Sequence, residues 1–116
     1  MGYWLLGFLL THLPMRSQSE GLVANQDKYM HCLLYAGLAL LLATWLGACR
    51  KTRSTIVLTF LICSLYGVLD EGLQALIPTR DASLGDWIAD VVGTSAGCLG
   101  YGVLAGIWQA KCSPDE

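Results

Sequence analysis

Long stretches without a charged residue constrain the fold of this chain more than any other feature of its sequence. Residues 30–49, 54–69 and 91–110 contain no Asp, Glu, Lys or Arg. A helix needs about 20 apolar residues to cross the roughly 30 Å hydrocarbon core of a membrane. The middle stretch extends to residue 77 if Asp70 and Glu71 are tolerated within the same helix. The sequence therefore predicts an all-α integral membrane protein.

Composition and a further apolar segment extend this prediction to a bundle of four transmembrane helices. Of the 116 residues, 54% are hydrophobic and 14% are charged, whereas about 25% are charged in an ordinary soluble domain. A shorter apolar segment near the N-terminus ends at Pro14, which interrupts helical hydrogen bonding. The predicted helices are at about 2–15, 28–49, 55–77 and 84–110. They leave no room for a soluble domain, so we expect residues 1–116 to form a single domain.

A basic turn sets the predicted orientation. Arg50, Lys51 and Arg53 lie close together between the second and third predicted helices. Cytoplasmic loops carry an excess of Lys and Arg, so we place this turn inside the cell. Four helices then give an N-in/C-in topology. We expect Asn25 or Asp27 to cap the second helix.

Several classes of protein are disfavoured by the sequence. The formal net charge of −2 and the absence of a basic patch argue against nucleic-acid binding. The five cysteines are odd in number and form no CxxC pair, so we interpret them as packing residues rather than a disulfide framework or zinc site. The chain has no HExxH or P-loop motif. We therefore assign no metal and no cofactor, although sequence spacing cannot test a site whose ligands come from different helices.

Polar side chains gather at the predicted outer ends of three helices. Asp27, Lys28, His31 and Tyr35 begin the second helix, Asp70, Glu71 and Gln74 end the third, Arg80 lies in the following loop, and Asp86 and Asp90 begin the fourth. Gln74 is four residues from Asp70 and three from Glu71, so it can bond to either carboxylate. Ionisable groups inside a membrane indicate a functional site by default. The alternative is a hydrogen-bonded network that only ties the helices together.

This ordered set of residues resembles the VanZ-like family. The pattern is Asp27-Lys28-x-x-His31-x-x-x-Tyr35, Tyr66-x-x-x-Asp70-Glu71-x-x-Gln74, Pro78-x-Arg80-x-x-Ser83-x-x-Asp86, and then Gly93 and Gly97. It covers roughly residues 11–106. The sequence departs from the pattern at Ala89-Asp90, where an Asn is expected, so Asp90 is left out of the predicted site.

The resemblance implies a small multi-helix protein of the bacterial cytoplasmic membrane. The family's namesake is linked to resistance to glycopeptide antibiotics, which bind cell-wall precursors. The resemblance implies no particular reaction, so the function has to be argued from the residues.

Two hypotheses from different classes follow for the polar cluster. The first is a binding module for the anionic head group of a lipid-linked cell-envelope precursor, because Arg and Lys suit phosphate. Its predicted ligand-binding residues are Asp27, Lys28, Tyr35, Gln74, Arg80 and Asp86. The second is an intramembrane hydrolase or transferase acting on the same class of lipid-linked substrate. Its candidate catalytic residues are Glu71, Asp70 and His31, since paired carboxylates and a histidine can divide acid and base roles.

Two further expectations concern partners and transport. Gly93/Gly97 and Gly102/Gly106 each place two small residues four apart on the fourth helix, a spacing that lets membrane helices approach closely. We expect membrane lipids as partners and a homo-oligomer formed through this glycine face. An ion or proton pathway is the least favoured function, because the predicted inner half of the helices carries no charged relay.

Overall fold

Long helices account for nearly all of the chain that the structure describes. The computed structural model describes Gly2 and residues 22–76 and 84–112, with the side chains of 28–76 and 84–111. Within these ranges the helices are α2 (Leu22–Gly47), α3 (Thr52–Gln74) and α4 (Leu84–Cys112). The described ranges contain no strand. The all-α fold class is thus confirmed.

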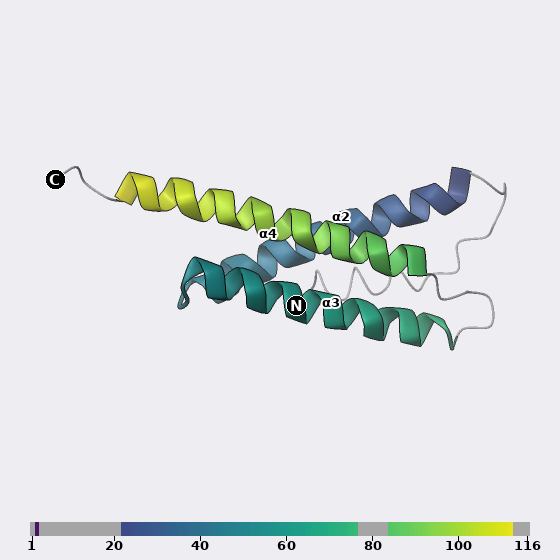
Figure 1. Cartoon of the computed structure of the whole chain (residues 1–116). Helices are drawn as coiled ribbons and strands as arrows, with labels where there is room; N and C mark the ends of the chain where they lie inside the picture. Colours follow the sequence, from purple (N-terminus) through teal and green to yellow (C-terminus); the bar gives the residue numbers. More distant parts are fainter. Residues whose placement is uncertain (1, 3–21, 77–83, 113–116) are drawn as a thin grey trace.

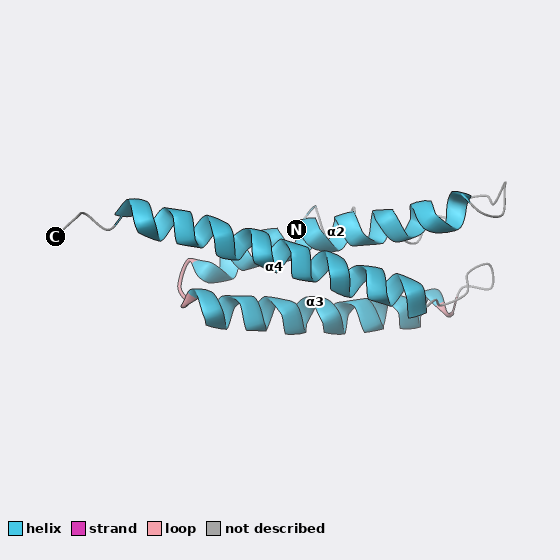
Figure 2. Ribbon diagram, turned by 45° about the horizontal axis from the view of Figure 1, so that its top comes forward, coloured by secondary structure: helices cyan, strands magenta, loops and turns pink. Residues whose placement is uncertain are grey.

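The helices run alternately along one axis (Figure 1). α2 and α4 point in one direction and α3 in the other, so the start of α2, the end of α3 and the start of α4 share one end of the bundle. α4 packs most extensively against α2 and also contacts α3, and the crossing of α4 over α2 is visible in both views (Figure 2). We call the shared end the polar end.

The helices are long and apolar enough to cross a membrane. The segments that meet this condition are Lys28–Gly47, Thr52–Gln74 and Leu84–Lys111. At 1.5 Å per residue the shortest of them, with 20 residues, spans about 30 Å, which matches the hydrocarbon core. The helix predicted at 2–15 lies outside the described residues except for Gly2. Four helices and the N-in/C-in orientation therefore stay predictions.

The surface of the bundle is more apolar than its interior. Large side chains such as Leu33, Trp45, Leu99 and Trp108 are about two-thirds exposed or more. The interior holds small or polar side chains, including Ala39, Cys63 and Thr59, each with no exposed surface. Soluble proteins bury their large apolar residues. In a membrane, lipid solvates large apolar side chains, and close contacts between small residues hold the helices together. This distribution suits a bundle surrounded by lipid.

Each helix buries one stripe of residues that recur every four positions. The stripes are His31, Tyr35, Ala39 and Ala43 on α2; Thr55, Thr59, Cys63, Gly67 and Glu71 on α3; and Asp86, Asp90, Thr94 and Cys98 on α4. Rows at i, i+4 form the ridges through which helices commonly cross. The most polar members of all three stripes lie toward the polar end, which is where a site can form.

Two glycines bring α4 into contact with α2. A methyl group on Gly93 would overlap the backbone carbonyl oxygen of Cys32, and one on Gly97 would overlap that of Ala36. Only residues without a side chain allow backbones to approach this closely. Gly93 and Gly97 thus serve packing within the chain, while no atom of the described residues lies within 4 Å of a methyl group built on Gly106.

The helix boundaries differ from the predicted ones mainly at the start of α2. The predicted start was residue 28, but α2 begins at Leu22. Asn25 and Asp27 therefore lie inside the helix, and the prediction that one of them caps it is wrong. Polar residues are tolerated in the first turns of a helix that extends beyond the hydrocarbon, because water or lipid head groups can solvate them there.

Candidate functional site

A histidine and an aspartate from different helices form the centre of the polar end. His31 Nδ1 of α2 lies 2.9 Å from Asp90 Oδ1 of α4, and their side chains are 1% and 0% exposed. With Asp90 ionised, the Nδ1–H of His31 donates to the carboxylate, and the lone pair of the neutral ring is then on Nε2. Gly93 lies one turn after Asp90, so the close approach of α4 to α2 is what makes this short contact possible.

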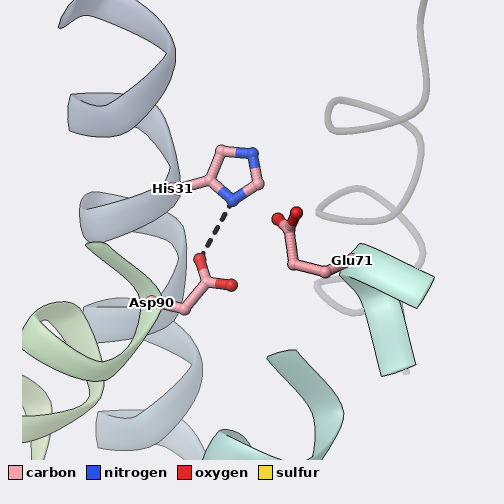
Figure 3. A group of neighbouring side chains, drawn as sticks. All are labelled: His31, Glu71 and Asp90. Carbon is pink, nitrogen blue, oxygen red and sulfur yellow. Dashed lines mark hydrogen bonds and ion pairs between the residues drawn. The ribbon is translucent and has the colours of Figure 1, made fainter. Parts of the chain in front are cut away.

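Glu71 of α3 completes a group of three side chains. One potential ligand atom each from His31, Glu71 and Asp90 lies within 4.8 Å of the others. Figure 3 shows the imidazole and both carboxylates directed toward a common space between the helices. Each residue is contributed by a different helix, so the group exists only when all three helices are packed. We refer to His31, Glu71 and Asp90 as the His–Glu–Asp group.

A second buried pair lies beside this group on α3. Gln74 Nε2 donates a hydrogen bond of 3.1 Å to Asp70 Oδ2, and both residues are 2% exposed. The four-residue spacing predicted a bond from Gln74 to either carboxylate, and the structure confirms the one to Asp70. Asp70 and Glu71 are thus both buried near the C-terminal end of α3, and the bond holds the Asp70 carboxylate in a fixed orientation.

Two tyrosines lie one turn further into the bundle. The rings of Tyr35 and Tyr66 are 6.1 Å apart between centroids and tilted by 38°, a favourable arrangement for an aromatic pair. Tyr35 is 3% exposed and belongs to the core cluster with Leu38, Ala39, Cys63 and Cys98. The aromatic pair therefore connects the polar end to the core cluster.

The second carboxylate oxygen of Asp90 is a buried acceptor at the site. Among the described residues, Asp90 Oδ2 has no hydrogen-bond partner although it is fully buried. A methyl group on Gly67 would lie 3.1 Å from this oxygen and 3.4 Å from a ring carbon of Trp87. Glycine at this position of α3 therefore leaves the space that the Asp90 side chain occupies.

Cations are placed differently from the carboxylates. The Lys and Arg side chains of residues 28–76 and 84–111 are all exposed. Lys28 emerges near the polar end, whereas Arg50, Lys51, Arg53 and Lys111 belong to the opposite end of the bundle. The carboxyl groups of Asp70, Glu71, Asp86 and Asp90 are at most 9% exposed. In this part of the chain, His31 is the basic side chain that is buried with the carboxylates.

The structure brings some of the predicted site residues together and separates others. The residues buried at the polar end are His31, Tyr35, Asp70, Glu71, Gln74 and Asp86. Lys28 is exposed and does not join them, as expected for a long side chain that carries its charge toward water or head groups. Arg80 and the side chain of Asp27 lie outside the described residues.

The sequence analysis placed Asp90 in the polar cluster but left it out of the predicted site, whereas the structure places it at the centre of the site. The signal that could have found it is its spacing: Asp90 shares one helix face with Gly93 and Gly97, the residues of closest approach to α2. A carboxylate on that face must meet the neighbouring helix. The departure from the VanZ-like pattern at this position led us away from that conclusion.

Comparisons with models of protein families, with curated proteins and with solved structures found no match.

Proposed function

We propose that this chain is a multi-spanning protein of the bacterial cytoplasmic membrane that binds the polar head group of a lipid-linked cell-envelope precursor. The observation that carries the proposal is the His–Glu–Asp group, buried at one end of a bundle whose surface is apolar. A lipid-linked molecule can approach such a bundle sideways through the membrane and place its polar head at the polar end. The cost of burying carboxylates among membrane helices is more readily explained by a function than by stability alone.

The proposed orientation places the polar end at the outer face of the membrane. The basic residues Arg50, Lys51 and Arg53 lie at the opposite end, where the excess of positive charge favours the cytoplasm. Lys28, together with Arg80, which precedes α4 in the sequence, would contact phosphate oxygens. The resemblance to the VanZ-like family supports this choice of ligand, and it makes glycopeptide resistance of expressing cells the phenotype to measure.

Retention of lipid by the purified chain tests the proposal. We expect the chain purified in mild detergent to carry polyprenyl-phosphate-linked molecules at a higher ratio to phospholipid than the membrane it came from, as measured by mass spectrometry. Lys28→Gln combined with Arg80→Gln should reduce this enrichment at least tenfold, because both cations for phosphate are lost. The matched control is Lys51→Gln with Arg53→Gln, which removes two exposed cations at the opposite end. The proposal fails if wild type shows no enrichment, or if the control loses as much as the test variant.

A second candidate function, an intramembrane hydrolase or transferase on the same lipid-linked substrate, is favoured by the contact between His31 and Asp90. A histidine oriented by a carboxylate is the arrangement found in general acid–base catalysis, and the Glu71 and Asp70 carboxylates lie beside it. Glu71→Gln should then lower product formation at least about 100-fold while the substrate stays bound. Thr59→Val, a buried change three turns away on α3, is the control. A chain that releases no product from a polyprenyl-pyrophosphate-linked substrate would refute catalysis.

Self-association is proposed through the remaining glycines of α4. Gly93 and Gly97 are covered by α2, but Gly106 is open and Gly102 meets only the end of the Ile56 side chain at 3.4 Å. This part of the face can contact a second copy. Crosslinking in membranes should give a dimer that Gly106→Leu abolishes, and an unchanged dimer would exclude this face.

A further inference from the structure

We propose that His31, Glu71 and Asp90 bind one divalent transition-metal ion between the three helices. The residue types are the first reason. Neutral imidazole and carboxylate oxygens are both common ligands of Zn²⁺, and a mixed set of this kind selects transition metals over Mg²⁺ and Ca²⁺, which prefer oxygen alone. The sequence could not indicate this site because its ligands come from three helices that are far apart along the chain.

The spacing of the ligand atoms is close to that around a single ion. Zn²⁺ binds nitrogen and carboxylate oxygen at about 2.0–2.2 Å, so ligands on opposite sides of an ion lie roughly 4.2 Å apart or less. The three side chains offer atoms within 4.8 Å of one another. A small rotation of the Glu71 side chain, which is the longest and the most exposed of the three at 9%, would bring them to binding distance.

The position of Asp90 Oδ2 is a second, independent observation. This oxygen belongs to a side chain with no exposed surface and has no hydrogen-bond partner within the described ranges. In Figure 3 the Asp90 oxygen without the dashed line lies on the side of Asp90 that faces Glu71. Buried polar atoms are nearly always satisfied by protein, water or an ion. A cation in the space between the three side chains would satisfy Oδ2 and at the same time contact the other two residues.

The contact between His31 and Asp90 is compatible with an ion. An ion in this space would replace the proton between Nδ1 and Asp90 Oδ1, because their separation of 2.9 Å needs to widen only slightly for both atoms to bind one ion. Either oxygen of the Asp90 carboxylate can then bind the ion. Protein ligands from three residues leave coordination positions open, which is typical of sites where a metal meets a ligand molecule.

An open position would also supply a cation to the proposed head-group site. Phosphate oxygens bind divalent ions directly, and the buried carboxylates alone would repel them. This consequence rests on the proposed function, whereas metal binding itself does not. The two are separated experimentally, because metal binding is measured on the purified chain without any lipid-linked precursor.

Metal binding by the full chain in detergent is the test. Cys49 is exposed and Cys112 lies near the chain end, so both are first replaced by Ser to remove competing thiols. After treatment with a chelator, the protein is titrated with ZnCl₂ by calorimetry, with MgCl₂ as the comparison. We expect one Zn²⁺ per chain, with an affinity for Mg²⁺ at least 100-fold weaker. A chain that binds no Zn²⁺ with 1:1 stoichiometry overturns the proposal.

Variants of the ligands and one neighbour locate the ion. Asp90→Asn and Glu71→Gln should each weaken Zn²⁺ binding at least tenfold, because each removes a charged ligand at nearly unchanged volume. Thr94→Val is the matched control, since Thr94 is equally buried one turn further along α4 and should bind Zn²⁺ like wild type. Equal loss in the control and in Asp90→Asn would overturn the assignment.

A second measurement needs no ligand variant, so it tests the proposal even if a variant fails to fold. X-ray absorption is recorded at the zinc edge on the chain that keeps His31, Glu71 and Asp90. The expected first shell contains nitrogen and oxygen at about 2.0–2.2 Å with one imidazole. A sulfur shell near 2.3 Å would show that a thiol holds the ion instead, and the proposal would be wrong.

Discussion

Gly93→Ala should separate α4 from α2 and break the contact between His31 and Asp90. The added methyl carbon would overlap the Cys32 carbonyl oxygen, and a backbone atom cannot turn aside as a side chain can. Restoring an ordinary carbon–oxygen contact requires a shift of roughly 1 Å. Asp90 lies one turn before Gly93, so the same shift lengthens the 2.9 Å contact to His31 beyond the hydrogen-bonding limit of about 3.2 Å.

The expected loss of stability has two sources. Overpacking of a close interface costs about 1–3 kcal/mol, and a hydrogen bond between membrane helices contributes about 0.6–1.7 kcal/mol. We therefore expect the free energy of unfolding to fall by about 2–4 kcal/mol. The assay is reversible unfolding in mixed micelles with increasing fractions of SDS, followed by circular dichroism and by the fluorescence of the tryptophans.

Gly106→Ala is the matched control for this prediction. It makes the same substitution on the same helix, but in the part of the chain that the structure describes nothing lies within 4 Å of the new methyl group. Alanine favours a helix by about 1 kcal/mol over glycine, so this variant should be as stable as wild type or slightly more stable. If Gly93→Ala proves as stable as Gly106→Ala, the close packing of α2 against α4 is incorrect.

Three further predictions concern the packing around Asp90, the orientation of the chain in the membrane and the exposure of two tryptophans to lipid. Gly67→Ala should lower the free energy of unfolding by about 1–3 kcal/mol, because its methyl group would press on the Asp90 carboxylate and Trp87; stability equal to wild type would contradict this packing. In chains with one remaining cysteine, a maleimide should label exposed Cys49 and leave buried Cys63 unlabelled. A membrane-impermeant reagent should reach Cys49 only after cells are opened. Labelling of Cys49 in intact cells would contradict the proposed orientation. Trp45 and Trp108 are 75% and 71% exposed, so lipids brominated on their acyl chains should quench their fluorescence, and unquenched fluorescence would show that these residues face protein or water.

The helices could be predicted from the sequence because hydrocarbon leaves a chain few alternatives. Long uncharged stretches must be helical where they cross a membrane, since every backbone group needs a partner there. The predicted end of the second helix, residue 49, differs by only two residues from Gly47. Its start could not be predicted, because beyond the hydrocarbon a helix and an extended chain are both solvated, and Asn25 and Asp27 are acceptable in either.

The location of the candidate site could be predicted, but not its contacts. Alternation of helix direction is enough to bring His31 and Glu71 to the same end of the bundle. Which side chains then meet depends on the rotation of each helix about its axis, and small residues such as Gly93 and Gly67 set that rotation through contacts between helices. This is why Asp90 was left out of the predicted site and why Lys28, three residues from His31, proved to be exposed.

A double-mutant cycle between His31 and Asp90 shows whether the helices build one buried polar site. The unfolding free energies of wild type, His31→Ala, Asp90→Ala and the double variant are measured in mixed micelles, and Lys28→Ala replaces His31→Ala in a control cycle. We expect a coupling energy of about 1 kcal/mol or more between His31 and Asp90. We expect no coupling energy between exposed Lys28 and Asp90. Additive losses for His31 and Asp90 would contradict the first of these expectations, because two side chains that share a short buried hydrogen bond cannot act independently.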